Sequence, residues 1–232
     1  MPAATSAPVV ILCDFDGTVT LRDSNDALVE HFVGAARRLA FDRRVRDHRA
    51  PLWQVLDEAL QACNVSLEVA LAHLLAHVPL DPDFAAFSRW CEGQGWPVRI
   101  VSAGVHEVIA AFLAREGLEV PIAANRARLL EGCFGLVPAD PTCPTGVDKA
   151  GIVQACRAAG AFTVFLGDGM SDRLAVPHAD LVLAKGQLAA YCAHKGLAHV
   201  AFPHFSWVRS QLEALVQASL AARAASSEAC PP

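Results

Sequence analysis

The chain has 232 residues, of which 53% are hydrophobic and 19% charged, and its formal net charge is −5 at pH 7. This length is enough for one well-filled domain, or for a core domain with a smaller insertion. The slight acidic excess argues against a nucleic-acid-binding protein. The sequence contains no run of about 18 uncharged apolar residues, so no membrane-spanning helix is predicted. The chain also starts without the basic and apolar regions of a secretory signal.

Its eight cysteines form no Cys-x-x-Cys pair, which is typical of buried thiols in a reducing compartment. We therefore expect a cytoplasmic protein with no nucleic-acid or membrane partner.

Apolar runs typical of buried strands alternate with amphipathic helical segments along most of the chain. Strands are expected at Val9–Cys13, Val98–Val101, Pro121–Ala124, Phe162–Leu166, Asp180–Ala184 and His199–Phe202. Helices are expected at Val105–Glu116, Lys149–Ala159, Gly186–Lys195 and Phe205–Arg223, and a short hairpin at Leu129–Val137. This alternation predicts an α/β fold with a mostly parallel sheet that is covered on both faces.

One long interval, from Thr18 to Trp96, interrupts this alternation. It contains no good strand and is far longer than a single crossover helix requires. Amphipathic helices fit instead, and a further helix at Phe84–Glu92 returns the chain to the sheet. The expected limits are residues 20–85 for a helical insertion, and residues 1–19 together with 86–232 for the core.

Two of the expected strands end in pairs of aspartates. The strand Val9–Cys13 runs into DFDGT, which contains Asp14 and Asp16, and Phe162–Leu166 runs into GDGMSD, which contains Asp168 and Asp172. The carboxyl ends of parallel strands lie along one edge of a sheet, where ligands bind. We therefore expect the four carboxylates to face one crevice, although a simple turn is the alternative for each pair.

Electrostatic repulsion favours a metal site over a turn. Two unit charges about 4 Å apart interact by roughly 4 kcal/mol at an effective dielectric near 20. A divalent cation removes this repulsion, and ligand sets made of oxygen alone favour Mg²⁺. Ser102, after the strand Val98–Val101, and Lys149, at the start of a helix, add the neutral donor and the cation that a phosphate dianion needs. Together these groups predict phosphoryl transfer.

The motifs DFDGT, VSAG, the lysine of DKAGIV, and GDGMSD resemble, in order and context, the four motifs of the haloacid dehalogenase superfamily of phosphatases. The resemblance covers nearly the whole chain and implies a Rossmann-like core with an α-helical cap domain inserted after the first motif. It implies that Asp14 is the nucleophile that forms an aspartyl-phosphate. Asp16 would be the general acid for the leaving alkoxide and then the general base for water.

The same resemblance implies the binding residues. The substrate would be held by Asp23, Ser102, Ala103, Gly104 and Lys149. Mg²⁺ would be bound by Asp14, the backbone carbonyl of Asp16, and Asp168, with Asp172 either contacting the metal directly or only fixing its loop. Taken singly, Ser102 fits a helix N-cap and Lys149 an ordinary surface lysine.

The substrate is predicted to be a small-molecule phosphate ester, because a cap hinders entry of a folded phosphoprotein. The stretch from GDGMSD to FPHFSWV resembles the methionine-salvage phosphatases that act on 2-hydroxy-3-keto-5-methylthiopentenyl 1-phosphate. A phosphoserine phosphatase is the alternative, although the shorter Asp23 stands where those enzymes usually place a glutamate for the substrate amine. A phosphotransferase or mutase, and a non-catalytic binding module on the same fold, are further alternatives. Both a monomer and a homodimer fit the sequence.

Two other features call for interpretation. Residues 37–49 contain six arginines, namely Arg37, Arg38, Arg43, Arg44, Arg46 and Arg49. A solvated helix face is the simple explanation, but on one helix Arg38 and Arg49 would lie within about 20° of a common face with Val45 and could contact a substrate. His73 and His77 have a metal-compatible spacing, but no third ligand is evident, so we expect a plain surface.

Overall fold

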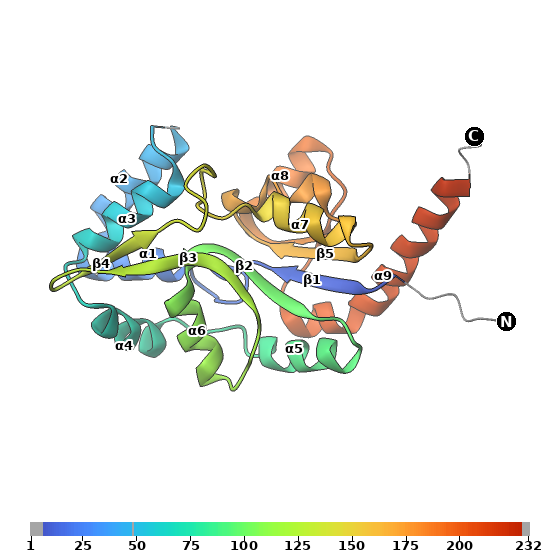
Figure 1. The fold of residues 1–232 in the computed structure, drawn as a ribbon, viewed down its shortest axis with the longest axis horizontal. Helices are drawn as coiled ribbons and strands as arrows, with labels where there is room; N and C mark the ends of the chain where they lie inside the picture. The colour runs from blue at the N-terminus through green and yellow to red at the C-terminus, as the bar shows by residue number, and fades with distance from the viewer. Residues whose placement is uncertain (1–6, 48, 229–232) are drawn as a thin grey trace. The chain divides into compact units, whose positions relative to one another are not determined.

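The structure is a computed structural model in which residues 7–47 and 49–228 are described (Figure 1). Contacts between residues divide the chain into two units. The first contains the residues up to Leu12, Pro82–Val98, and the residues from Ala150 onward; the second contains Cys13–Asp81 and Arg99–Lys149. The expected division into a core and a cap stays a prediction.

The first unit contains most of the parallel strands. Its elements are β1 (Val9–Cys13), α5 (Phe84–Gly93), α7 (Lys149–Ala158), β5 (Phe162–Gly167), the short 3-10 helices η1 (Met170–Asp172) and η2 (Val176–His178), β6 (Leu181–Ala184), α8 (Gly186–Lys195), β7 (Val200–Ala201) and α9 (Phe205–Glu228). β5 pairs in parallel with β6, and β6 with β7, while β1 is the neighbour of β5 on its other side. Every residue of β5 is buried, as expected for a strand covered on both faces.

Aromatic packing joins α5 to α9 in this unit. The ring centroids of Phe84 and Phe205 are 5.0 Å apart, as are those of Phe87 and Phe205, and all three side chains are almost completely buried. Aromatic pairs at this distance add to the stabilisation from burial. The predicted helices at both positions are confirmed.

The second unit combines the remaining strands with a group of helices. Its elements are α1 (Ser24–Phe32), α2 (Ala35–Arg46), α3 (Leu52–Ala62), α4 (Leu67–His77), β2 (Val98–Val105, which begins in the first unit), α6 (His106–Arg115), β3 (Ile122–Leu129) and β4 (Phe134–Val137). The interval predicted to be helical is therefore occupied by α1 to α4. α6 packs on β3, and Figure 1 shows α3 alongside β4.

Two strands are longer than the sequence predicts. β2 continues through Ser102–Gly104 to Val105, and its pairing with β3 shifts in register between Val101 and Val105. β3 is one continuous strand, which pairs in parallel with β2 and then in antiparallel fashion with β4. The strand and the hairpin predicted separately are thus joined, because the polar segment Asn125–Arg128 that separates them in sequence is also extended.

The predicted α/β fold with a mostly parallel sheet is confirmed. Within the described ranges, no single helix is long and apolar enough to cross a membrane. The helices α3 and α4 reach the required length and apolar composition only when taken together, and the chain bends by 97° between them.

Candidate active site

The first predicted motif places Asp14 directly after β1, where it forms an ion pair with Lys149. The ammonium Nζ of Lys149 donates to Oδ1 of Asp14 over 2.7 Å, and the two side chains are only 1% and 7% exposed. Each charge loses several kcal/mol of hydration at such a site. A buried ion pair is therefore weak evidence for a stabilising role. A role in a reaction explains better why the pair lies directly after β1.

Asp16 is held by the N-terminus of α1. Its Oδ1 accepts a hydrogen bond from the backbone N–H of Ser24 at 2.9 Å, and its Oδ2 accepts one from Nδ2 of Asn25 at 3.3 Å. The N-terminus of a helix carries partial positive charge and unpaired N–H groups, which suit a carboxylate. The orientation of this carboxylate is thus fixed before any ligand binds.

The second predicted motif lies at the end of β2 and close to Asp16. Ser102 is 1% exposed, and its Oγ accepts a hydrogen bond from the N–H of Gly104 at 2.9 Å. A Cβ atom at Gly104 would lie 2.6 Å from Oδ2 of Asp16 and 3.2 Å from Oγ of Ser102. Only glycine therefore leaves room for this carboxylate and this hydroxyl together. Ala103, which is also predicted to contact the substrate, lies between Ser102 and Gly104 in β2 and is 9% exposed.

The fourth predicted motif belongs to the first unit, where Asp172 organises the loop after β5. Its Oδ2 accepts hydrogen bonds from the N–H groups of Asp168 at 3.1 Å and Gly169 at 3.0 Å. A Cβ atom at Gly167 would lie 2.6 Å from the same oxygen. Asp172 is completely buried and Asp168 is half-buried. Oδ2 of Asp172 thus shapes the loop, which fits the loop-fixing alternative.

Asp23, predicted to bind substrate, is the N-cap of α1. Its Oδ1 accepts from the N–H of Asp26 at 2.9 Å. Burial, and then the nearby charge of Asp16, raise the pKa of Asp23 to about 7. Burial and the charge of Asp23 similarly raise the pKa of Asp26 to about 6. The start of α1 therefore collects carboxyl groups that hold protons more tightly than usual.

The arginine-rich segment corresponds only partly to the sequence prediction. α2 ends at Arg46, so Arg49 lies beyond the helix, and the common helical face predicted for Arg38 and Arg49 is wrong. Asp47 follows the last helical turn and pairs with Arg49 at 3.2 Å.

Two other arginines of this segment form ion pairs with carboxylates. Arg38 contacts Asp26 at 2.9 Å and Asp42 at 2.8 Å. Arg44 forms a bidentate pair with Glu58, with distances of 2.5 and 3.1 Å. Arg38 thus links α2 to the first turn of α1, and Arg44 links α2 to α3.

The histidine pair on α4 gains a neighbour from α1. The ring of His31 stacks on His73 with centroids 3.9 Å apart, and His73 stacks on His77 at 4.4 Å. The planes are inclined by only 24° and 21°, so their in-plane lone pairs do not converge on a common point. Burial and the neighbouring histidines lower the pKa of His73. A stack of aromatic rings explains these residues better than a metal centre.

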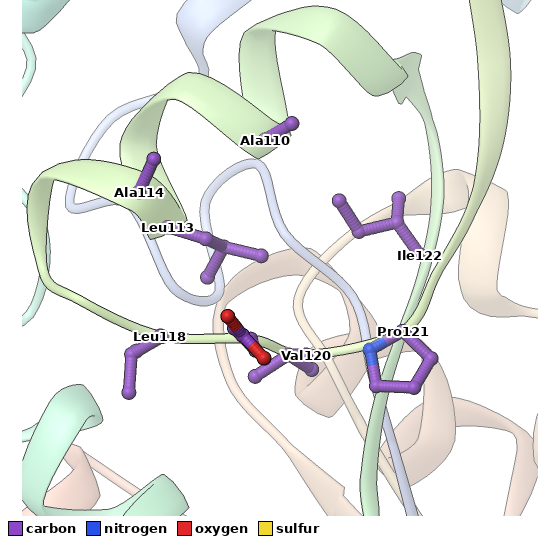
Figure 2. Close-up of a pocket in the computed structure, with 8 residues that line it drawn as sticks. Ala110, Leu113, Ala114, Leu118, Val120, Pro121 and Ile122 are labelled. Carbon is purple, nitrogen blue, oxygen red and sulfur yellow. The ribbon is translucent and has the colours of Figure 1, made fainter.

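A shallow apolar pocket of about 350 Å³ lies between α6 and the start of β3 (Figure 2). Its lining includes Leu113, Leu118, Val120 and Ile122, with Glu119 as the charged member. The residues that line it include none of those predicted for the site. Apart from Glu119 its lining residues are apolar, whereas ligand sites usually contain several polar groups that orient the ligand.

One buried polar residue that the sequence analysis missed is Asn125 in β3. Its side chain is completely buried and forms hydrogen bonds with backbone atoms near Ser102 and in the loop before Lys149. Asparagine is uncommon within strands, so an asparagine inside the run PIAANRA was a signal that could have been used.

The chain is similar to known proteins over most of its length. Residues 11–176 match the model of the haloacid dehalogenase-like hydrolase family. The Pdp3-interacting factor 1 of Schizosaccharomyces pombe is 28% identical over 91% of this chain and 98% of its own length. A polyol phosphate phosphatase of Saccharomyces cerevisiae is 28% identical over 88% of this chain and 92% of its own. The 2-hydroxy-3-keto-5-methylthiopentenyl-1-phosphate phosphatase of Brevibacillus brevis is 26% identical, over 86% and 93%.

Solved structures show the same fold. A substrate-bound phosphoserine phosphatase superimposes with a TM-score of 0.67 at 16% identity, over 88% of this chain and 97% of that one. A second phosphoserine phosphatase, with an analogue of the phospho-aspartyl intermediate, gives a TM-score of 0.65 at 17% identity, over 90% and 99%. At these identities the likeness concerns the fold alone.

Proposed function

Since the chain belongs to the haloacid dehalogenase-like hydrolase family and is a phosphoric monoester hydrolase, we propose that it removes phosphate from a small metabolite through an aspartyl-phosphate. The observation that carries this proposal is the buried pair of Asp14 and Lys149, joined over 2.7 Å. The pair places a carboxylate that can act as a nucleophile next to a cation that can bind a phosphoryl oxygen.

In the first step, a carboxylate oxygen of Asp14 attacks phosphorus, and the bond from phosphorus to the ester oxygen breaks. Lys149 and the hydroxyl of Ser102 bind phosphoryl oxygens, where the transition state spreads negative charge. Because the Oγ of Ser102 already accepts from Gly104, its own proton is available for donation to such an oxygen. Pre-set donors of this kind need no reorganisation during the reaction.

Asp16 acts on the other side of the breaking bond. In its protonated form it gives a proton to the leaving alkoxide, and as a carboxylate it then removes a proton from the water that attacks the acyl phosphate. The hydrogen bonds from Ser24 and Asn25 hold this carboxyl group in one orientation. Its proximity to Ser102, set by Gly104, is consistent with this role.

The donor set fits Mg²⁺. We propose that Asp14, the backbone carbonyl of Asp16, and Asp168 bind the ion together, with Asp172 supporting the loop, which requires the two units to bring their carboxylates to one point. All of these donors are oxygens, and the three carboxylates are buried or half-buried, as suits a hard cation. When bound, Mg²⁺ would neutralise charge on the phosphoryl group.

The charges of α1 and α2 favour a substrate whose second part is uncharged and rich in hydroxyl groups. Arg38 and Arg44 already pair with carboxylates, and Asp23, with a pKa of about 7, is only partly ionised at neutral pH. The first candidate substrate is 2-hydroxy-3-keto-5-methylthiopentenyl 1-phosphate, and a polyol phosphate is the second, in line with the relatives. Phosphoserine, which carries an ammonium and a carboxylate, is the alternative.

The test is phosphate release by the purified chain with Mg²⁺ from these three substrates and from p-nitrophenyl phosphate. We expect the highest kcat/KM for one of the two hydroxylated esters. A preference for phosphoserine would support the alternative, and no release from any substrate would overturn the proposal. Adding an alcohol as acceptor separates hydrolysis from phosphotransfer, since a phosphotransferase would pass most of the phosphate to the alcohol.

A further inference from the structure

Asn125 is a buried amide whose hydrogen bonds connect three backbone segments. Its Nδ2 donates to the carbonyl of Ala103 at 2.7 Å and to the carbonyl of Thr145 at 3.2 Å. Its Oδ1 accepts from the N–H of Ala139 at 3.1 Å. Both donor hydrogens and the acceptor oxygen are therefore used, as a completely buried amide requires.

The bond to Ala103 fixes the orientation of the next peptide N–H. The carbonyl of Ala103 and the N–H of Gly104 belong to the same planar peptide unit, and this N–H donates to Oγ of Ser102 at 2.9 Å. Asn125 thus acts through one rigid plane on the hydroxyl of Ser102. Val105 pairs with Asn125 in the β2–β3 ladder, which fixes the position of the amide relative to this peptide.

The other two bonds hold the loop that leads to Lys149. Ala139 and Thr145 lie near the two ends of this loop, which is closed by a hydrogen bond from the N–H of Asp140 to the carbonyl of Gly146 at 2.7 Å. The chain then passes to Lys149, whose N–H donates to the carbonyl of Val147 at 3.0 Å.

Gly146 leaves no free space around this amide. Its φ is +76°, and a Cβ atom there would overlap with Oδ1 of Asn125. The side chain of Asn125 is therefore confined between the loop and the end of β2, and a shift of the amide would be passed to both.

We propose that Asn125 is a positioning residue, which sets the placement of Ser102 relative to Lys149 so that both bind one phosphoryl group. This inference rests on the proposed function. A misplacement of about 1 Å can cost about a hundredfold in rate, and loss of a hydrogen bond that orients a metal ligand, a comparable supporting role, typically costs about 10- to 100-fold. Asn125 contacts neither substrate nor metal in this role.

The experiment compares Asn125→Ala with Thr163→Val. Thr163 is an equally buried polar residue in β5, and its side chain both donates to and accepts from Asp180. Its replacement therefore removes similar hydrogen bonds without changing a contact to the segments that contain Ser102 and Lys149. We expect both variants to lower the melting temperature. Only Asn125→Ala should lower kcat/KM for p-nitrophenyl phosphate, by about 10- to 100-fold, and weaken inhibition by inorganic phosphate.

A double-mutant cycle with Ser102→Ala tests whether Asn125 acts through that hydroxyl. We expect the combined loss of kcat/KM to be clearly smaller than the product of the two single losses. Losses that multiply, or an Asn125→Ala enzyme as active as Thr163→Val, would overturn the inference. Failure of the proposed function is distinguished from both, because the unmodified chain would then hydrolyse no phosphate ester.

If Asn125→Ala does not fold, Asn125→Asp takes its place. This variant keeps the shape and the acceptor for Ala139 but sets a carboxylate oxygen against the two carbonyls. Its kcat/KM relative to the unmodified enzyme should recover as the pH falls, because the protonated carboxyl can again donate to one carbonyl. A ratio that does not change with pH would contradict the positioning role.

Discussion

Lys149 and Asp14 lie 135 positions apart in sequence, and their side chains meet over 2.7 Å in an almost fully buried ion pair. The loop 138–148 and the end of β1 must both be correctly placed for this contact to form. The pair therefore connects the folding of the second unit to the proposed nucleophile.

Asp14→Asn is expected to abolish turnover, because the amide cannot attack phosphorus as a carboxylate does. It also removes the charge of Asp14 from the buried pair with the ammonium of Lys149. Breaking a buried pair in this way typically lowers the free energy of unfolding by about 3–5 kcal/mol. Steady-state kinetics and urea titration measure the two effects, and an Asp14→Asn enzyme with substantial activity would contradict the assignment of the nucleophile.

Asp16→Asn is expected to slow the reaction according to the leaving group. The amide can still accept from the N–H of Ser24 but has no acidic proton to transfer to the leaving group. The loss should reach about 10²- to 10⁴-fold for an alkyl phosphate and be much smaller for p-nitrophenyl phosphate, whose leaving group needs little protonation. Asn25→Ala, which removes only the hydrogen bond to Oδ2, serves as the matched control with a smaller loss. Equal losses on both esters would exclude Asp16 as the general acid.

Removal of metal is expected to abolish activity, and Mg²⁺ to restore it. Ca²⁺ should restore little, because its larger and looser coordination misplaces the reacting groups. Asp168→Asn should also abolish the rise in melting temperature that Mg²⁺ gives the unmodified chain. For Asp172→Asn, loss of this rise would indicate a direct metal contact, whereas a lower melting temperature with the rise retained would indicate loop support. Full activity in chelator, with metal absent by elemental analysis, would contradict the metal site.

The elements that position the site could be predicted because their signals are local. The apolar run before DFDGT and the one before GDGMSD each identify a strand, and β1 begins and ends as predicted. Asn125 could not be assigned a role, because its partners Ala103 and Thr145 are about 20 positions away on either side and are backbone atoms. Every residue type offers the same backbone carbonyl and N–H, so a hydrogen bond to the backbone does not determine which residue stands at the partner position.

The segment 37–49 shows a second limit of the sequence. Helical periodicity could not reveal that α2 ends at Arg46. It also could not show that Arg38 and Arg44 pair with carboxylates from other helices. Such pairings depend on how helices pack, and charge pattern alone does not specify them.

The raised pKa of Asp23 predicts how stability changes with pH. Its pKa is about 7 in the folded chain against an ordinary value of 3.8, mainly because of burial and then because of Asp16. Between these two values the folded chain holds a proton that the unfolded chain has released. The corresponding stability is therefore fully present below about pH 3.8 and is lost as the pH rises through about 7.

Asp23→Asn removes this titration but retains the N-cap, since asparagine caps helices as well as aspartate does. The melting temperature of the variant should exceed that of the unmodified chain at pH 8, and the difference should shrink as the pH falls toward 4. Asp140→Asn is the control of opposite sign, because hydrogen bonds from Thr142 lower the pKa of Asp140, so this change should not raise the melting temperature at pH 8. Thermal unfolding in chelator from pH 4 to 8 measures both. A benefit of Asp23→Asn that is the same at every pH would mean that Asp23 is not protonated in the fold, and that burial at the start of α1 does not hold its proton.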